Sequence, residues 1–258
     1  MFCADGCFYV VKFQNNPQGT RVLANELLVS QLANRLGLPV SPVAIVQVEE
    51  ALLRVSPDLS FELQSGRAPC QPGLHFGSRH LGKVLDLMPR SMLSRVQNRA
   101  AFAGAVVLDK WTGNIDPRQA IFRKSRADSP YQAFFIDHGL CFGGRDWRFA
   151  NSPAHGTYAE LAVYEEITSW ESFEPWLTRA ESMDEGEIWR CAADVPEEWY
   201  EKNSADLGQL VERLSRRRSQ VRKLIAALRD SSLRPFPNWT SSPEQVVVAA
   251  GMPELCLS

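Results

Sequence analysis

Apolar positions near the start of the chain follow two different spacings, and each spacing predicts a different kind of element. Residues 8–13 are aromatic or β-branched apart from one lysine, which indicates a strand. Leucines recur at helical intervals over residues 22–36 and Gly37 follows them, so we expect a helix that ends at this glycine. Residues 43–48 again favour a strand.

The middle of the chain has shorter apolar runs separated by polar segments. Residues 56–73 are rich in Ser, Pro and Gly, which predicts a loop or an insertion. Residues 95–111 are apolar and contain many small side chains, which indicates a closely packed buried helix. Short strands are expected at 76–81, 84–88, 119–122 and 132–136, the last two joined by a charged hairpin.

From residue 159 onward the pattern becomes helical. Helices are expected at 160–168, 172–180, 183–193 and 205–228. The run Ser215–Ser219 contains three arginines, and we interpret it as part of the solvated face of the last helix. The tryptophans that recur through this part are interpreted as packing residues.

Strand-rich segments followed by helical ones predict a protein of the α+β class with two lobes. We expect a small N-lobe of strands plus one helix at residues 1–88, and a mostly helical C-lobe at residues 89–230. Residues 231–258 contain several prolines and serines and are predicted to form a loose tail.

Composition narrows the possible classes of protein. The 258 residues are 45% hydrophobic and 22% charged, which is ordinary for a globular chain and excludes wholesale disorder or a pure coiled coil. The formal net charge of −2 leaves no broad basic surface, so direct binding of nucleic acid is not expected. No apolar run reaches the roughly 18–20 residues of a membrane helix, so no membrane association is expected.

The N-terminus and the cysteines bear on where the chain resides. The first residues have neither the basic region nor the apolar core of a secretory signal. The six cysteines include no Cys-x-x-Cys pair, so neither a zinc ribbon nor a disulfide framework is expected. We therefore predict a cytoplasmic location with reduced thiols.

Two aspartates follow apolar elements in the centre of the chain. Asp116 lies in a polar loop that comes directly after the predicted buried helix. Asp137 stands at the end of an apolar strand, two residues before Gly139, where its carboxylate suits a hard divalent cation. Gln119 lies between them and supplies an amide oxygen. A loop acid, an amide and a strand-end Asp-x-Gly follow one another in this order in phosphoryl-transfer sites.

A phosphoryl-transfer site also needs a cation on the nucleotide phosphates. Lys12 lies in the middle of the first predicted strand, and Glu26 lies on the helix that follows. This arrangement matches the strand lysine and helix glutamate of kinases. Each residue alone has an ordinary alternative role, since a lysine on a strand edge and a glutamate on a helix are most often solvated. Their order along the chain with Asp116 and Asp137 is the more specific signal.

The same residues carry a resemblance to a known family. Lys12 in YVVKF and Asn25-Glu26 in VLANELLVSQLANRLGLPV resemble the HipA-like kinases, which belong to the wider protein-kinase and phosphatidylinositol 3-/4-kinase-like fold. The segments TGNID, which ends at Asp116, and IDHG, which contains Asp137, are similar to the family's catalytic loop and metal-binding segment. The resemblance covers roughly residues 8–145.

The resemblance implies a role for each of these residues. Asp116 is implied as the catalytic acid, Asp137 as a Mg²⁺ ligand, and Lys12 as the contact to the ATP phosphates with Glu26 as its partner. The segment Phe76–Leu81 looks like the strand that leads to the adenine hinge, which makes His80 and Leu81 candidates for nucleotide binding. We therefore expect a kinase that uses ATP and Mg²⁺ and phosphorylates a Ser or Thr hydroxyl of a protein.

The chain departs from the family pattern in two places. The family places an asparagine a few residues after the catalytic aspartate as second metal ligand, and here Gln119 is the nearest candidate. Only Met1–Cys7 precede the lysine strand, with a hairpin-like turn at Asp5-Gly6. We expect this segment to be too short for a first strand and a phosphate-covering loop.

These departures leave other functions open. A pseudokinase or interaction module would keep the fold and bind a partner without turnover. The acceptor can also be a lipid or a small-molecule alcohol, because this fold serves all three. Nucleotidyl transfer to a hydroxyl is a further alternative.

Overall fold

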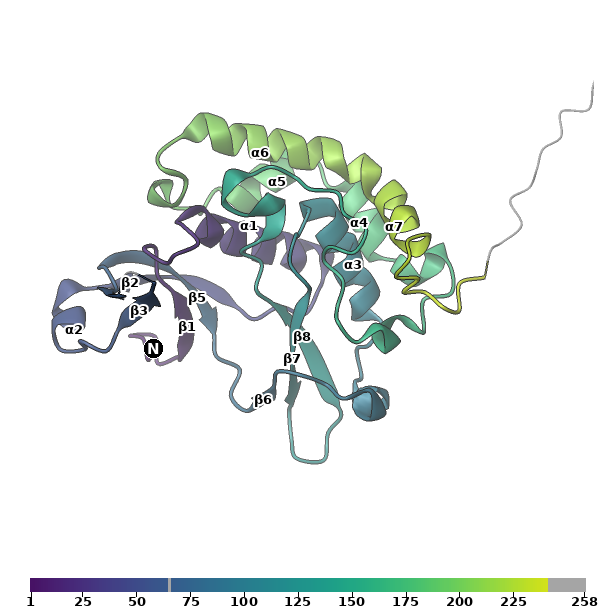
Figure 1. The fold of residues 1–258 in the computed structure, drawn as a ribbon, viewed down its shortest axis with the longest axis horizontal. Helices are drawn as coiled ribbons and strands as arrows, with labels where there is room; N and C mark the ends of the chain where they lie inside the picture. Colours follow the sequence, from purple (N-terminus) through teal and green to yellow (C-terminus); the bar gives the residue numbers. More distant parts are fainter. Residues whose placement is uncertain (65, 241–258) are drawn as a thin grey trace, which may run out of the picture.

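The computed structural model describes residues 1–64 and 66–240, and its N-terminal part is built on a three-stranded antiparallel sheet (Figure 1). The strand order is β1-β5-β2, with bounds Tyr9–Lys12, Gly73–Arg79 and Val43–Val48. Lys12 of β1 and Ile45 of β2 both pair with Phe76 of β5. The predicted strands are present, and β5 begins three residues earlier than expected.

A short hairpin precedes β1. The backbone N–H of Tyr9 donates to the carbonyl of Met1 at 2.8 Å, and Phe2 pairs with Phe8. The turn lies at Asp5-Gly6 as expected, because Gly6 has a φ of 76° and the Asp5 carboxylate accepts the N–H of Cys7 at 3.0 Å. Residues 1–8 are therefore ordered against the start of β1.

The segment predicted as a loop, residues 56–73, contains a second hairpin instead. Strands β3 (Ser60–Leu63) and β4 (Gly66–Pro69) pair with each other after a short helix, α2 (Glu50–Arg54). Phe61 of β3 lies edge-on to Phe13, beside a small core that includes Val46 and Val48. Composition pointed to a loop because only one face of this hairpin is apolar.

Helix α1 (Arg21–Leu36) is buried over most of its surface and ends where the sequence predicts. Gly37 adopts the left-handed conformation with a φ of 78°, and its N–H donates to the carbonyl of Asn34 at 3.0 Å. The helix packs on β5 on one side and on the C-terminal helices on the other, as Figure 1 shows. It is therefore the element that joins the two parts of the molecule.

A second three-stranded sheet lies beside this helix, in the order β6-β7-β8 (Val84–Leu85, Gln119–Lys124, Tyr131–Ile136). Helix α3 (Ala101–Thr112) packs against it through Phe102, which contacts Phe122 and Phe135. This helix begins later than predicted, because Val96 pairs with Tyr131 and residues 97–100 form turns in place of its first residues. A 3-10 helix, η1 (Arg90–Arg95), precedes them. The helix is buried along its whole length, as its small residues predict.

The C-terminal part is helical, although its elements are shorter than predicted. The α-helices are α4 (Trp176–Ser182), α5 (Glu185–Ala192), α6 (Ser204–Arg217) and α7 (Val221–Arg229). The prediction of a helix at 160–168 is wrong, since only the 3-10 turn η3 (Leu161–Tyr164) forms there. The helix expected at 205–228 is interrupted by the 3-10 turn η6 (Arg218–Gln220). The apolar spacing marks which side chains are buried and does not show where the backbone turns.

Residues 231–240, the start of the predicted tail, pack on the helical part. Phe236 is buried against Phe173, and Trp239 lies edge-on to Trp170. Trp170, Trp176 and Trp199 pack on or within the core, as predicted, whereas Trp189 is 41% exposed. The remainder of the predicted tail, residues 241–258, lies outside the described residues.

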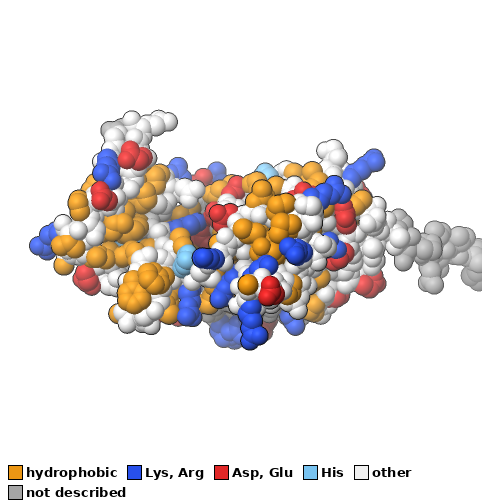
Figure 2. Space-filling view, turned by 90° about the horizontal axis from the view of Figure 1, so that it is seen from below, with side chains coloured by type: hydrophobic (Ala, Val, Ile, Leu, Met, Phe, Trp, Pro, Cys, Tyr) orange, Lys and Arg blue, Asp and Glu red, His pale blue; other side chains and the backbone are white. Residues whose placement is uncertain are grey.

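Within residues 1–64 and 66–240, no helix combines the length and the apolar character that crossing a bilayer requires. On the face that Figure 2 shows, basic side chains lie between acidic and apolar ones, and hydrophobic side chains gather over the strand-rich end. The exposed apolar residues include Phe2, Phe8 and Val10.

His75 generates a prediction about pH. Its side chain is fully buried, its Nδ1 accepts the N–H of Gln14 at 3.0 Å, and burial lowers the pKa of its imidazole. The folded protein thus keeps His75 neutral at a pH where the unfolded chain binds a proton. Its stabilising contribution is present above the unfolded pKa of about 6.5 and is lost as the pH falls toward the lower, folded pKa.

We expect the free energy of unfolding to decrease as the pH is lowered through that window. In a His75→Asn variant this decrease should be smaller. The difference is at most about 1.4 kcal/mol for each pH unit, which is the coupling of one proton. Urea unfolding at pH 7, 6 and 5 measures it. Parallel curves for the two proteins would contradict this assignment.

Candidate active site

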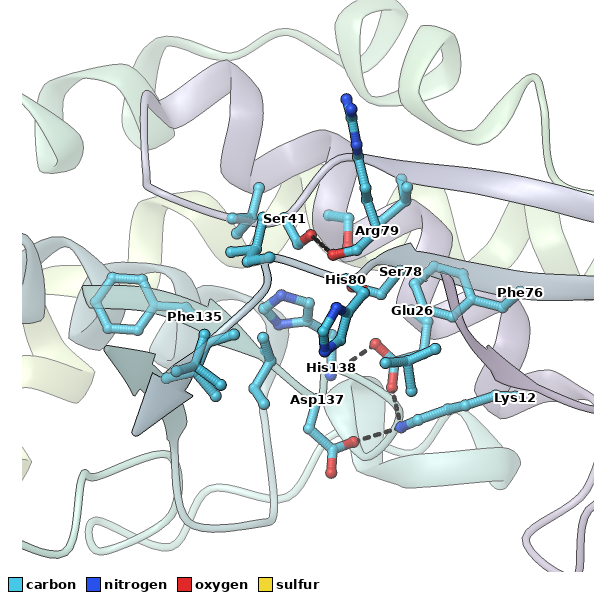
Figure 3. Close-up of a pocket in the computed structure, with 18 of the residues that line it drawn as sticks. Lys12, Glu26, Ser41, Phe76, Ser78, Arg79, His80, Phe135, Asp137 and His138 are labelled. Atoms are coloured by element: carbon cyan, nitrogen blue, oxygen red, sulfur yellow. Dashed lines mark hydrogen bonds and ion pairs between the residues drawn. The ribbon is translucent and has the colours of Figure 1, made fainter. Parts of the chain in front are cut away.

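A cavity of about 330 Å³ lies between the N-terminal sheet and strand β8. Figure 3 shows Lys12 and Glu26 approaching it from one side and Phe135 and Asp137 from the other. Its walls are largely apolar, and polar groups gather where β1, α1 and the end of β8 meet. The apolar lining includes Val10, Val40, Val43, Phe76, Ile121, Phe135 and Ile136.

The structure brings together three of the residues predicted for the site. The Lys12 ammonium contacts the Glu26 carboxylate, and its Nζ lies 2.7 Å from Oδ1 of Asp137. Glu26 is 2% exposed, whereas Lys12 and Asp137 are about one-third exposed and open to the cavity. The lysine is therefore held between a buried and an accessible carboxylate.

Charge and burial oppose each other in this group. Burial alone would depress the pKa of Lys12, but the attraction of Glu26 and Asp137 outweighs it and raises the pKa above its usual value. Burial dominates at Glu26 and raises the pKa of its carboxyl. Burial alone would raise the pKa of Asp137, but the attraction of Lys12 outweighs it, and the pKa is lowered. An ammonium and an ionised carboxylate therefore face the cavity.

Glu26 also fixes the backbone of the segment that follows β8. Its Oε2 accepts the N–H of His138 at 2.9 Å, and its Oε1 accepts the N–H of Gly139 at 3.0 Å. A Cβ at position 139 would lie 3.3 Å from Oε1 of Glu26, so this close approach favours glycine. The helix glutamate thus positions both the lysine and the Asp-x-Gly segment.

Asn25 makes a second link between α1 and the same segment. Its side-chain N–H groups donate to the carbonyls of Gly139 at 2.7 Å and Cys141 at 3.1 Å. Its Oδ1 accepts the indole N–H of Trp147 at 2.7 Å. The buried Asn25-Glu26 pair therefore ties about ten residues after β8 to one turn of helix.

Asp137 stands in a left-handed conformation, with a φ of 60°. Its Oδ1 faces Lys12, and its Oδ2 accepts the side-chain N–H of Gln119 at 2.8 Å. Gln119 lies on β7, paired with Ile136 across the sheet. In this arrangement the amide nitrogen of Gln119 faces Asp137, and the amide oxygen that we expected on a metal is directed elsewhere.

Asp116 does not line the cavity. It lies in the loop between α3 and β7, where its N–H donates to Oδ1 of Asn114 at 3.1 Å and its carbonyl accepts the N–H of Gly156 at 3.1 Å. Its carboxylate makes no hydrogen bond or ion pair with any residue that the structure describes. The loop is thus held by its backbone, and this carboxylate stays free for a ligand.

His80 and Leu81 follow the end of β5 and line the cavity, as expected for a hinge. The N–H of His80 donates to the carbonyl of Phe8 at 2.7 Å, which fixes the chain as it leaves the sheet. The N–H of Leu81 has no hydrogen-bond partner among the described residues.

A buried ion pair supports both loops, and sequence reasoning missed it. Arg118 and Asp109 are fully buried and form a bidentate ion pair, in which Nε of Arg118 lies 2.9 Å from Oδ2 of Asp109. Arg118 also donates to the carbonyl of Ile136 at 2.8 Å, while Oδ1 of Asp109 accepts the side-chain N–H of Asn114 at 3.0 Å. The pair therefore connects the loop of Asp116 to the backbone at Asp137.

His138 is a second residue that the sequence did not reveal as part of the site. It is 2% exposed and lines the cavity, as Figure 3 shows, and its Nδ1 lies 3.2 Å from the guanidinium of Arg118. Burial, and then the nearby Arg118, lowers the pKa of this histidine. Its Nε2 is buried and has no partner among the described residues. Since Arg118 is a donor only, Nε2 carries the proton and can donate to a ligand.

Comparison with known proteins places this geometry in a family. The model of the HipA-like kinase family matches residues 2–227, which include every residue of the site. The chain belongs to the HipA-like kinase family. This membership confirms the resemblance drawn from Lys12, Asn25-Glu26, Asp116 and Asp137. It also agrees with the bilobal, protein-kinase-like arrangement of a strand-rich part and a helical part.

Solved structures that match part of this chain include two of the Golgi casein kinase, one of them with Mn/ADP bound. Each has a TM-score of 0.49 and 13% identity, and the match covers 90% of this chain and 70% of the other. The Helicobacter pylori proinflammatory kinase CtkA has a TM-score of 0.48 and 14% identity, with 88% of this chain and 90% of the other covered. No curated protein sequence matches this HipA-like kinase.

The buried pair gives a prediction about stability. In an Arg118→Met variant, Asp109 remains buried without its partner, and we expect the free energy of unfolding to fall by about 3–5 kcal/mol. Replacing both residues, as Arg118→Met with Asp109→Leu, removes the uncompensated charge and should recover part of the loss. Urea unfolding of both variants checks this. A double variant less stable than Arg118→Met would contradict it.

Proposed function

We propose that this HipA-like kinase transfers the γ-phosphoryl group of ATP to the hydroxyl of a Ser or Thr side chain in a protein. The observation that carries the proposal is the contact of Lys12 with Glu26 and Asp137 at one end of the cavity. An ammonium beside an accessible carboxylate suits a nucleotide triphosphate with a metal ion, because the two charges bind opposite partners.

The cavity has the size and lining that a nucleotide requires. Its volume of about 330 Å³ falls within the usual range of ligand pockets, roughly 300–1,000 Å³. Apolar side chains such as Val43 and Phe76 form walls suited to a purine base. The unpartnered N–H of Leu81 and the buried Nε2 of His138 are donors that a bound nucleotide would satisfy. Lys12 would then contact its phosphate groups.

The donor set beside Lys12 also fits a magnesium ion. Asp137 supplies a carboxylate and Gln119 can turn its amide oxygen toward the same point. Mg²⁺ is usually held by one or two protein carboxylates together with substrate phosphates and water, so two protein ligands are enough. When bound, the ion would neutralise charge on the phosphates.

Asp116 is proposed to orient the acceptor hydroxyl and take its proton. Its unpartnered carboxylate sits on a loop that is fixed through Asn114 and Gly156. Such a carboxylate can accept a hydrogen bond from an incoming hydroxyl at little cost in reorganisation. Arg118 keeps this loop in register with the backbone at Asp137.

A pseudokinase is the second candidate, and one contact favours it. The amide nitrogen of Gln119, rather than its oxygen, faces Asp137 at 2.8 Å. A chain that binds nucleotide through Lys12 without turnover would be compatible with this contact.

Two aspartate variants separate these candidates. Asp116→Asn keeps the shape of the loop but removes the base, so we expect phosphoryl transfer from γ-labelled ATP to fall by about 100-fold or more with nucleotide binding retained. Asp137→Asn removes the metal ligand and should abolish magnesium-dependent binding. Incorporation of label and isothermal titration measure the two effects. Unchanged transfer by Asp116→Asn would refute its catalytic role.

Thermal unfolding with and without ATP and Mg²⁺ tests binding alone. At a ligand concentration of about 100 times Kd, we expect the wild type to gain about 2.7 kcal/mol, or a rise in Tm of about 5–10 °C. Lys12→Met should lose this shift, while Lys124→Met, on the distant β7–β8 hairpin, should keep it. A shift without label transfer identifies the pseudokinase, and no shift in the wild type counts against both candidates.

A further inference from the structure

A second polar recess lies behind the loop of Asp116, where α3 ends against α6 and α7. Lys110, Arg217 and His155 line it, together with Ser152, which is exposed at its rim. The recess holds only about 20 Å³, close to the volume needed for one water molecule. Any larger ligand must therefore sit at the rim and reach inward with its charged atoms.

The recess contains more buried positive charge than the described residues neutralise. Arg217 is 7% exposed although its neighbourhood in sequence predicts a solvated face, and it has no carboxylate partner among those residues. Lys110 is 5% exposed and is likewise without a carboxylate partner there. Asp109 also lines the recess, but both of its oxygens are already bonded, to Arg118 and Asn114. Two cations therefore remain without a matching anion.

The hydrogen bonds of these cations leave donors unused. Lys110 donates to the carbonyls of Pro153, at 2.8 Å, and His155. Nε of Arg217 donates to the carbonyl of Lys110 at 3.0 Å, and its guanidinium lies over the Phe149 ring, 5.0 Å from the ring centroid. Among the described residues, the two terminal nitrogens of Arg217 have no hydrogen-bond partner. The Arg217 contact caps the end of α3, yet arginine has five N–H donors and lysine three. Nδ1 of His155 is also buried without a partner among the described residues.

The pKa values of both cations are lowered, as expected for buried cations that lack a neighbouring anion of their own. Burial lowers the pKa of Lys110 to about 8, against the opposing attraction of Asp109, and the neighbouring Arg217 lowers it further. Burial lowers the pKa of Arg217 to about 10. A dianion at the rim would reverse both effects by restoring an opposite charge.

We propose that this recess is an anion site for a phosphate monoester, and that Ser152 is the residue that carries the phosphate. In the modification, the Ser152 Oγ forms a bond to the γ-phosphorus of ATP while the bond from that phosphorus to the β–γ bridging oxygen breaks. ADP leaves, and the hydroxyl proton passes to a base. The phosphate then accepts hydrogen bonds from Arg217 and Lys110.

The bound phosphate would fix a segment that touches the proposed active site. The carbonyls of Pro153 and His155 already accept from Lys110, and Gly156 donates to the carbonyl of Asp116 at 3.1 Å. A phosphate on Ser152 would add a further attachment to Lys110 and Arg217 at the start of this segment, where Ser152 is exposed. The site is independent of the kinase proposal, because another kinase can equally supply the phosphate.

The experiment uses the full chain with phosphoserine encoded genetically at position 152, which requires no activity of the chain itself. The control carries phosphoserine at Ser182, an exposed position on α4 between Glu181 and Asp184. Phosphorus NMR over pH 4–8 follows each phosphate. We expect the second pKa, ordinarily about 6, to be lower by about one unit at 152 than at 182.

Thermal unfolding gives a second measurement on the same proteins. Phosphoserine at 152 should raise Tm by about 3 °C over the unmodified chain, and phosphoserine at 182 should not. In an Arg217→Gln background, we expect both the NMR shift and the rise in Tm to shrink. If that variant fails to fold, the NMR comparison in the wild-type background decides by itself.

Three outcomes would overturn the proposal. The first is identical phosphate titration at 152 and 182. The second is an unchanged or lowered Tm on phosphorylation at 152. The third is binding of inorganic phosphate by a Ser152→Ala variant with the same rise in Tm, which would assign the recess to a free anion.

Discussion

A carboxylate buried on α1 is the constraint on which the site depends. Glu26 is almost wholly removed from water, so it requires both a counter-charge and hydrogen-bond donors. Lys12 supplies the charge from β1, and the N–H groups of His138 and Gly139 supply the donors from the far side of the cavity. One side chain thus joins α1 to β1 and to the segment after β8. Moving β1 would remove the counter-charge of Glu26, and moving the later segment would remove its hydrogen-bond donors.

The same helix explains how the two parts of the molecule form one unit. Beside Glu26, Asn25 binds the backbone after Gly139 and the indole of Trp147, and the apolar residues of α1 fill the space between the sheet and the C-terminal helices. The second support lies behind the segment at the end of β8, where Arg118 contacts Ile136 and His138 and, with Asp109, braces the loop before β7. The cavity is therefore enclosed by two buried polar networks set in an apolar frame.

Much of the secondary structure could be predicted from residue pattern. The helix that ends at Gly37 and the strands around Lys12 and Asp137 were predicted correctly, because apolar spacing and turn residues act locally. The hairpin at 60–69 and the break at Arg218–Gln220 were not, because each depends on packing against elements far away in the chain. Tertiary contacts override the local preference of a segment where they bury more apolar surface.

The sequence by itself determined the order of the chemical groups: a strand lysine, a helix glutamate, a loop aspartate and a strand-end aspartate. That order was enough to indicate the family. The tertiary structure alone decided which of them meet, because burial of Glu26 and the contact of Lys12 with Asp137 join residues more than a hundred positions apart. It also decided the partners of Arg118 and the burial of Arg217 without a carboxylate partner among the described residues, since whether a charge is buried depends on what folds over it.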